Sequence, residues 1–242
     1  MRLRIRFTKH GKVRFTSHRD VARIWERVVR RAQLPVAYSE GFNPRVKLSF
    51  GLALSTGHES EAEYIDIDLV PERAGGVDVD ALRQLLTELL PEGMTATAVG
   101  ITDRRGPSLQ QAVTSCTWRI DVADIDVETA AGAVARALAA ESLVVTRERK
   151  GKEVTDDLRP LVLSLDVDGP MEDGVRLTAE LGTQPRAVRP SELLAALDPP
   201  LIERVIRFLF DHCGIEHLGA EQRTFRVSWF DRDEGRSMAG EH

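Results

Sequence analysis

Ser17, His18 and Asp20 place a hydroxyl, an imidazole and a carboxylate within one short stretch of the chain. Nucleophilic catalysis uses these three groups, provided that the base lies beside the nucleophile and a third group orients the base. Ser17 also has a structural interpretation, because a serine with an acidic residue three positions on is typical of a helix N-cap. We therefore predict a helix cap at Ser17. His18, Asp20 and Tyr64 are kept as a candidate pocket for an enzyme acting on a small anionic substrate.

Asp66 and Asp68 are a second pair of groups that could do chemistry. They stand two residues apart in EYIDIDLV, so both carboxylates lie on one face of an expected strand. Paired carboxylates serve acid–base or metal chemistry. The alternative is that this strand lies beside an N-terminal strand and neutralises its arginines, Arg2, Arg4 and Arg6. We favour neutralisation.

The sequence has no metal, cofactor or nucleotide motif. Its 6 histidines and 2 cysteines do not have the spacing of metal ligands. The sequence also has no cysteine cluster for an iron–sulfur centre, no Walker loop and no GxGxxG motif after a strand. We expect no metal and no cofactor. The N-terminus shows no signal-peptide pattern, and no apolar run approaches the roughly 20 residues that span a bilayer. These patterns predict a soluble, cytoplasmic protein with no membrane partner, whose cysteines, Cys116 and Cys213, are buried thiols.

Alternation and helical spacing indicate which elements position these groups. Leu3, Ile5 and Phe7 alternate with arginines, which predicts a strand over 2–8. Apolar residues at helical spacing after Ser17 predict a helix over 17–33. Further segments complete the order strand, helix, strand, strand, helix, strand: strands at 46–50 and 63–70 forming a hairpin, a helix at 79–90 that ends at Pro91, and a strand at 94–101.

A similar order follows in the second half of the chain, after a linker at 103–108. The expected elements are strands at 112–122, 143–149, 160–167 and 175–181, a helix at 127–140, helical segments within 190–212 and a last strand at 223–230. Residues 150–157 interrupt the strands. We predict an α+β fold of tandem ferredoxin-like βαββαβ sandwiches with antiparallel sheets. The expected domains are 1–103, with a basic face, and 109–230, followed by a disordered tail at 231–242.

Positive charge is concentrated at the N-terminal end of an acidic protein. Residues 1–50 hold 13 of the 33 Lys and Arg but only 3 of the 38 Asp and Glu, while the whole chain has a net charge of −5. Four arginines of helix 17–33 fall within an arc of about 80° at 100° per residue: Arg19, Arg23, Arg27 and Arg30. The turn that follows adds Phe42, Asn43, Arg45 and Lys47. Together they predict a surface for phosphate or another anion, with Phe42 and Tyr38 as candidates for base stacking.

Most of residues 1–230 resemble a radical SAM-associated bacterial domain of unknown function, in a stand-alone form without the radical SAM domain, and the segment from Phe15 to Leu69 is the most specific part. The matching motifs are Ser17-His18-Asp20, Arg27 with Arg30-Arg31-Ala32, Gly41-Phe42-Asn43-Pro44, Ser49-Phe50, Glu63-Tyr64, Lys150-Gly151-Lys152 with Asp157, Arg159-Pro160 and Gln222-Arg223-Thr224. Arg45 stands where the family tends to have a histidine. The resemblance implies a domain that presents or recognises a substrate, and it favours RNA as the partner.

Three functional hypotheses follow from these observations. The first is a non-enzymatic RNA- or anion-binding accessory protein that presents substrate to a radical SAM or RNA-processing enzyme. The second is a protein-interaction module in which the arginines meet an acidic partner enzyme and Phe42 is an anchor. The third is an enzyme on a small anionic substrate near His18 and Asp20. The sequence leaves the ligand and the oligomeric state open.

Overall fold

The computed structural model describes residues 1–52, 54–74, 78–102 and 107–215, which form a mixed α+β protein around one sheet. The sheet has eight strands, seven of them in the order β4 (Met94–Thr102), β1 (Arg2–Lys9), β3 (Glu59–Asp68), β10 (Val205–Ile215), β5 (Val113–Ala123), β9 (Gly174–Gly182) and β8 (Val162–Met171). The eighth, β2 (Leu48–Phe50), pairs with β3. Every pairing except that of β3 with β10 is antiparallel, which confirms the predicted α+β class.

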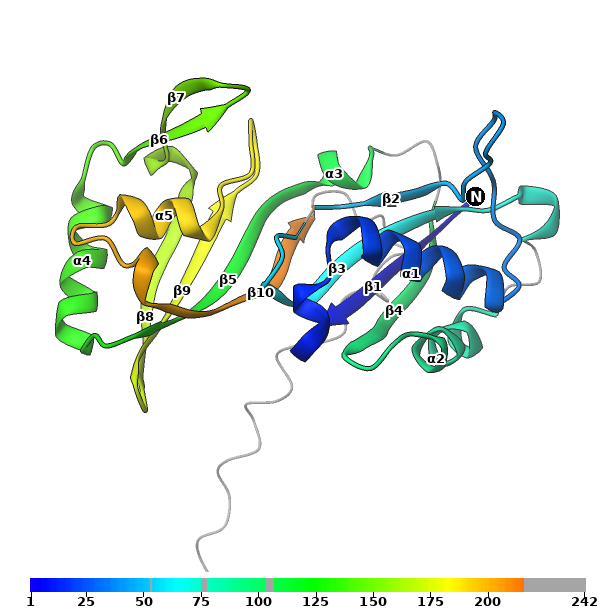
Figure 1. Cartoon of the computed structure of the whole chain (residues 1–242), viewed down its shortest axis with the longest axis horizontal. Helices are drawn as coiled ribbons and strands as arrows, with labels where there is room; N and C mark the ends of the chain where they lie inside the picture. The colour runs from blue at the N-terminus through cyan, green and yellow to red at the C-terminus, as the bar shows by residue number, and fades with distance from the viewer. Residues whose placement is uncertain (53, 75–77, 103–106, 216–242) are drawn as a thin grey trace, which may run out of the picture.

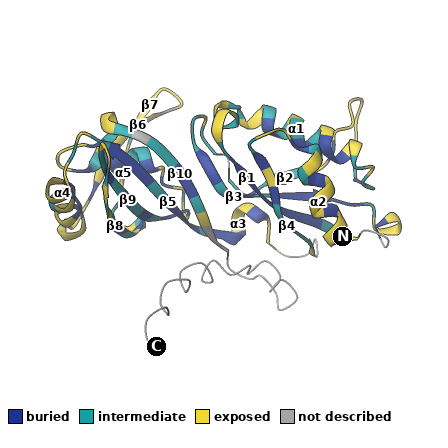
Figure 2. Ribbon diagram, turned by 90° about the horizontal axis from the view of Figure 1, so that it is seen from below, coloured by how far each residue is buried: buried dark blue, intermediate teal, exposed yellow. Residues whose placement is uncertain are grey.

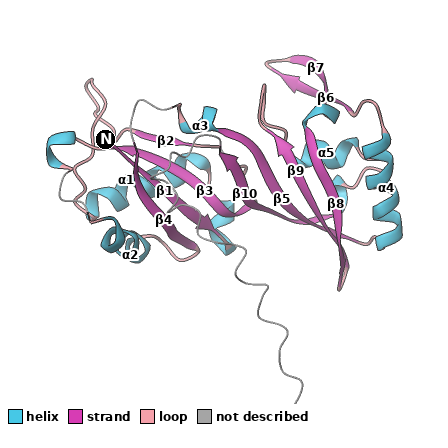
Figure 3. Cartoon of the chain, turned by 180° about the vertical axis from the view of Figure 1, so that it is seen from behind, coloured by secondary structure: helices cyan, strands magenta, loops and turns pink. Residues whose placement is uncertain are grey.

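Helices α1 (His18–Arg31) and α5 (Pro190–Ala196) lie on the same side of the sheet. They stand in front of the strands in Figure 1, and the strands stand in front of these helices in the reverse view of Figure 3. The remaining helices are α2 (Val79–Leu89), the short α3 (Leu109–Ala112) and α4 (Val127–Ala139). Single 3-10 turns occur at η1 (Gly11–Phe15), η2 (Pro71–Arg73), η3 (Arg159–Leu161) and η4 (Ile202–Arg204). The helices keep their outer faces exposed, as Figure 2 shows.

The first half forms around the apolar face of β1. Leu3, Ile5 and Phe7 are fully buried, and the ring of Phe7 meets that of Trp25 from α1 edge-on, with centroids 5.1 Å apart. Ser17 caps α1 by accepting a hydrogen bond from the backbone N–H of Asp20, so the predicted cap is confirmed. Backbone N–H groups in the first turn of a helix have no acceptor within the helix, and the Ser17 hydroxyl supplies one of them with an acceptor.

Two segments of the second half differ from the sequence prediction. Residues 205–212, the end of the region 190–212 in which helical segments were expected, belong to strand β10, because a short apolar run such as this one fits a buried helix and a buried strand equally well. Residues 152–157, expected to interrupt the strands, form β7 (Lys152–Asp157), which pairs with β6 (Val144–Arg149). Lys150 and Gly151 between them both have positive φ, as a two-residue hairpin turn requires. The strand expected at 223–230 and the tail at 231–242 lie outside the described residues.

A parallel contact between β3 and β10 joins the two halves into one sheet, where the sequence suggested a separate sheet for each. Leu209 lies opposite Glu59, and Phe210 opposite Ser60. Glu59 accepts hydrogen bonds from the backbone N–H of Gly11 (2.9 Å) and from Arg14 (3.2 Å). Burial favours the neutral acid, but these donors outweigh burial and hold the pKa of Glu59 below its usual range.

An ion network continues from Glu59 across the junction. Arg207 of β10 lies 3.7 Å from Glu59 and donates a 2.9 Å hydrogen bond to Asp121 of β5, which Arg176 of β9 also binds at 2.7 Å and 3.2 Å. Four strands are therefore connected through charged side chains as well as through the backbone.

The polar face of β1 carries the neutralisation that we predicted from Asp66 and Asp68. Arg4 binds Asp66 with two hydrogen bonds of 2.7 Å and 2.9 Å, and Arg2 binds Asp68 at 3.1 Å. Asp66 is 1% exposed. Arg6 lies opposite Tyr64 in the strand register and not opposite an aspartate. Arg2 and Arg4 are thus structural residues, whereas the predicted neutralisation of Arg6 by these aspartates is not found in the described chain.

We predict that Arg4→Met lowers the free energy of unfolding by about 3–5 kcal/mol, because it leaves the buried Asp66 carboxylate without its bidentate partner. Arg23→Met is the control: it breaks an exposed pair with Asp20, which is worth less than about 1 kcal/mol. Urea unfolding of the two variants measures both changes. Equal losses would contradict a structural role for the buried pair.

Candidate functional site: a basic surface and a buried cavity

Helix α1 presents a row of arginines to solvent. Its buried side consists of Val21, Trp25, Val28 and Val29, while four arginines on the opposite side are exposed: Arg19, Arg23, Arg27 and Arg30. Arg23 makes an ion pair with Asp20 at 3.0 Å. Among the residues that the structure describes, no carboxylate forms an ion pair with Arg19, Arg27 or Arg30. We call these four residues the arginine face.

The predicted turn after α1 is a short loop held by backbone pairing. Tyr38 and Val46 form an isolated β-bridge, and the backbone N–H of Ser39 donates to the carbonyl of Arg45 at 2.8 Å. Gly41, with φ of +121°, lets the chain reverse at the tip. Phe42 beside it is fully exposed. Asn43, Arg45 and Lys47 are exposed as well.

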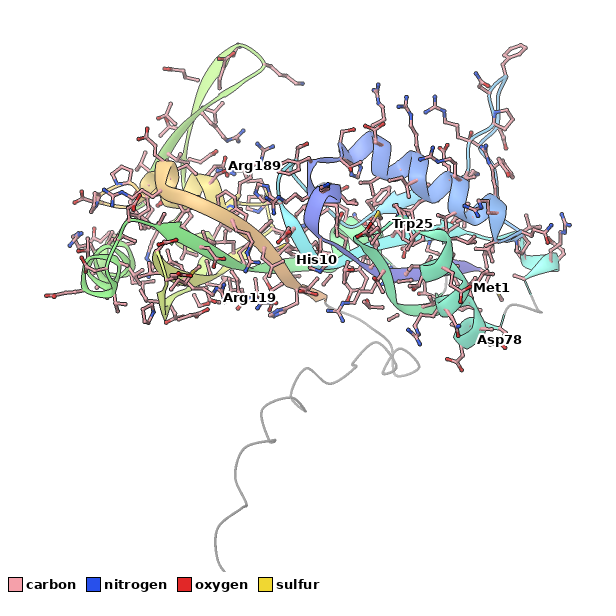
Figure 4. All side chains as sticks on the ribbon, turned by 60° about the horizontal axis from the view of Figure 1, so that its bottom comes forward. Met1, His10, Trp25, Asp78, Arg119 and Arg189 are labelled. Carbon is pink, nitrogen blue, oxygen red and sulfur yellow. The ribbon has the colours of Figure 1, made fainter. Side chains whose placement is uncertain are left out.

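The arginine face and the loop lie on the same side of the molecule. In Figure 4 nitrogen-tipped side chains stand on the outer side of α1, and the loop projects in the same direction from the right-hand end of that helix. The structure therefore places together the eight residues that the sequence assigned to an anion surface. We call them the basic surface: Arg19, Arg23, Arg27, Arg30, Phe42, Asn43, Arg45 and Lys47.

His18 and Asp20 both contact neighbouring side chains. The ring of His18 meets Phe50 edge-on, with centroids 4.7 Å apart. Burial and the nearby Lys9 ammonium lower the pKa of His18. Asp20 accepts a 2.7 Å hydrogen bond from the hydroxyl of Ser17, which holds the pKa of Asp20 below its usual range. Ser17 and Asp20 are thus engaged in capping α1.

Tyr64 lines a cavity of about 260 Å³ at the junction of the two halves, whereas His18 and Asp20 are not among the described lining residues. The cavity lies at a gap along one edge of β3: β2 pairs with residues 65–67 of β3 and β10 with residues 59–60. Its lining includes Ala62, Glu63 and Tyr64 from between these two pairings, with Trp118 of β5 and Phe210 of β10 from the second half.

Glu63 is the most unusual of the lining residues, because one oxygen of its buried carboxylate has no hydrogen-bond partner in the described chain. Its side chain is 6% exposed, and within the described chain no donor reaches its Oε1 atom. Burial raises the pKa of Glu63 to about 7, although the Lys9 ammonium, 3.9 Å away, acts in the opposite direction. Lys9 itself is 1% exposed, and burial lowers its pKa.

Aromatic rings form much of the cavity wall. The ring of His58 stacks on Phe208 with centroids 4.7 Å apart and meets Trp118 edge-on at 5.6 Å, while Phe210 packs against Trp118 at 5.2 Å. The indole N–H of Trp118 is buried without a hydrogen-bond partner in the described chain. Burial lowers the pKa of His58, and the charges of Lys9 and Arg189 lower it further.

Sequence reasoning missed this cavity, apart from Tyr64. Its residues come from several segments that only the folded sheet brings together. One signal was present: Glu63 occupies the same face of β3 as the buried Ile65 and Ile67, so an acid stands at an apolar position of the alternation.

Two classes of site are not found in the described part of the chain. No group of three or more His, Cys, Asp or Glu residues there could hold a metal ion. No helix there has the length and apolar character needed to cross a membrane.

These features define an α+β protein with a basic helix face and a cavity where the two halves of its sheet meet. The chain belongs to a family described as an uncharacterized protein conserved in bacteria, DUF2344, whose sequence profile matches residues 2–190. This description mentions no radical SAM enzyme, so the association that the sequence suggested stays a prediction.

Comparison with curated proteins finds no match. Among solved structures, one chain of "Crystal Structure of a Cbf5-Nop10-Gar1 Complex" is similar over 89% of this chain, with 9% identity and a TM-score of 0.46. The match covers 50% of that chain, so this protein spans half of its length.

The raised pKa of Glu63 gives a prediction about stability and pH. The folded protein holds a proton on Glu63 up to about pH 7, whereas an ordinary glutamate releases it near 4.5. The native state therefore binds more protons than the unfolded state in this window, and stability decreases as the pH rises through it. Relative to Glu63→Gln, which does not titrate, the wild-type free energy of unfolding should fall by about 3 kcal/mol between about pH 4.5 and pH 8.

Urea unfolding at a series of pH values measures this difference. Glu92→Gln, at an exposed position, is the control and should follow the wild-type curve at every pH. Parallel curves for wild type and Glu63→Gln would show that the Glu63 carboxyl titrates at its ordinary pKa.

Proposed function

We propose that the protein binds RNA through the basic surface, as a non-enzymatic accessory protein. The observation that supports this most directly is the arginine face: Arg19, Arg27 and Arg30 are exposed on one side of α1 and make no ion pair with a carboxylate of the described chain. The chain as a whole has a net charge of −5, so such a row is a local exception. RNA is made in the bacterial cytoplasm, so we propose that the protein is located there as well.

The dimensions of the arginine face suit a nucleic acid strand. From Arg19 to Arg30 the helix rises about 17 Å at 1.5 Å per residue. A strand with one phosphate per 3.4 Å would present about five phosphates over that length. Each guanidinium is permanently charged and binds phosphate through two parallel hydrogen bonds. Contacts of this kind position a strand and carry no sequence information.

The loop adds a second kind of contact. Phe42 is fully exposed at the loop tip, between backbone segments held by the Tyr38–Val46 bridge. A ring in this position buries nothing within the protein and is available for stacking on an unpaired base. With Asn43, Arg45 and Lys47 beside it, the loop favours single-stranded or looped RNA over a regular duplex.

We further propose that each half is a ferredoxin-like βαββαβ unit. The strand orders β4-β1-β3-β2 and β10-β5-β9-β8 support this, since both place the first strand of the unit between its fourth and third. In each half the two helices connect strands in the order that this unit requires.

Charge reversal of the arginine face tests the RNA proposal. The variant Arg19→Glu/Arg27→Glu/Arg30→Glu should bind a fluorescein-labelled single-stranded RNA at least tenfold more weakly than wild type at low salt. The slope of log K against log salt should fall by about 2, because three phosphate contacts are lost. Fluorescence anisotropy at three salt concentrations measures both quantities.

The matched control is Arg73→Glu/Arg83→Glu/Lys152→Glu, which makes the same change in net charge at exposed positions outside α1 and the loop. It should retain most of the affinity. If both variants lose RNA affinity equally, the binding depends on net charge alone and the arginine face has no specific part in it. A partner that is retained on wild type after nuclease treatment, and lost with the reversed arginine face, would replace RNA by an acidic protein as the ligand.

Phe42→Ala tests the stacking contact separately. We expect a loss of about 1–3 kcal/mol in RNA binding without a change in the salt slope, because stacking involves no counterion release. The free energy of unfolding should stay within about 0.5 kcal/mol of wild type, since Phe42 is fully exposed. An unchanged affinity in the anisotropy assay would exclude Phe42 from the interface.

A further inference from the structure

The cavity at the β3 gap has no part in the RNA proposal, and its lining suggests a second binding site. We propose that it binds a planar heteroaromatic molecule of nucleobase size, stacked against its aromatic walls and hydrogen-bonded by Glu63 and Trp118. The proposal does not depend on RNA binding by the basic surface.

The size of the cavity limits its ligand to one or two rings. Small-molecule sites commonly have volumes of about 300–1,000 Å³, and this cavity, at about 260 Å³, is just below that range. A dinucleotide cofactor does not fit such a volume. Most of the lining is buried, but three residues at the opening are exposed, which gives a ligand access from solvent: Gln110, Ala187 and Arg189.

Three buried polar atoms of the lining have no hydrogen-bond partner in the described chain: Nδ1 of His58, Oε1 of Glu63 and Nε1 of Trp118. The Lys9 ammonium lies 3.9 Å from Oε1 of Glu63, which is too far for a hydrogen bond. Glu63 and Trp118 specify what the edge of the ligand must offer. Leaving such an atom unpaired costs about 1–3 kcal/mol. The indole N–H needs an acceptor, and the Glu63 carboxyl accepts from an N–H group. A nucleobase edge carries both functions within one flat ring system.

The walls favour a ring over water. Trp118, Phe210, Tyr64 and His58 contribute ring surfaces to the lining, together with aliphatic side chains such as Leu52 and Leu54. Water could satisfy the two polar atoms, but it would leave this apolar surface hydrated. A heteroaromatic ligand satisfies the polar atoms with its edge and buries the ring surfaces against its faces.

The opening adds a preference for an anionic substituent. Arg189 is exposed at the rim, and its charge is close enough to His58 to lower the pKa of that imidazole. Figure 4 places Arg189 at the junction, above the strands that contribute Trp118 and Phe210. A phosphate attached to the base would meet this guanidinium. Two sources share this chemistry: a free nucleoside monophosphate, and a base turned out of an RNA strand.

Calorimetric titration of the full-length protein tests the site. The probes are the four RNA nucleobases, their 5′-monophosphates and indole, which has an aromatic ring but no hydrogen-bond acceptor at its edge. At least one monophosphate should bind with 1:1 stoichiometry and a Kd below about 1 mM, and at least tenfold more tightly than indole. Absence of saturable binding by every base and monophosphate, or equal binding of indole, would overturn the proposal.

Three variants locate the ligand. Glu63→Leu and Trp118→Phe should each weaken the best probe about 5- to 150-fold, the equivalent of one lost hydrogen bond in a buried site. Glu63→Gln, which keeps a carbonyl acceptor, should retain most of the affinity that Glu63→Leu loses. Trp25→Phe is the matched control, because Trp25 is buried in the other core cluster and should leave the affinity unchanged. Circular dichroism checks that each variant is folded.

A last titration separates the two sources. Glu63→Leu should weaken an RNA oligonucleotide containing the preferred base if that base enters the cavity from the strand. If only the free monophosphate is affected, the ligand is a small molecule. If neither probe responds to Glu63→Leu or Trp118→Phe, the cavity is not the binding site.

Discussion

The parallel pairing of β3 with β10 is the constraint on which the rest of the architecture depends. It involves only two residue pairs, Glu59 with Leu209 and Ser60 with Phe210, yet it converts two four-stranded arrangements into one sheet. The Glu59–Arg207–Asp121 network reinforces it with charged groups that burial makes costly to separate. Because β10 pairs with one end of β3 and β2 with the other, residues 61–64 are left between them, and the cavity forms there.

The excess positive charge at the N-terminal end divides between the two faces of the first half. On β1, arginines pair with buried aspartates of β3 and stabilise the sheet. On α1 and the following loop, arginines are exposed and, apart from Arg23, have no carboxylate partner in the described chain. Charge that has been neutralised at short range contributes little field outside the protein, so the potential that attracts a polyanion arises mainly from the basic surface.

How much the sequence predicts depends on whether the signal is local. The Ser17 cap, the alternation of β1 and the arginine face of α1 are each set by neighbouring residues, and the structure confirms all three. Strand β10 was misassigned because its apolar run has no period that separates strand from helix. The β6–β7 hairpin depends on positive φ at Lys150, which lysine rarely adopts. The cavity combines segments from both halves, so the sequence named only Tyr64 of its lining, and the one further local signal was Glu63, an acid at an apolar position.

Strand β10 follows every other described strand in the chain, but it lies in the middle of the sheet. During synthesis the two cores can each assemble as their residues leave the ribosome, since each has its own set of buried side chains. Until residues 205–215 emerge, however, β3 and β5 both present open edges, whose unpaired N–H and C=O groups can pair with strands of other chains. The last of the described strands to be made therefore covers the edge of β5 and residues 59–60 of β3 together, and these edges stay open to other chains until it arrives.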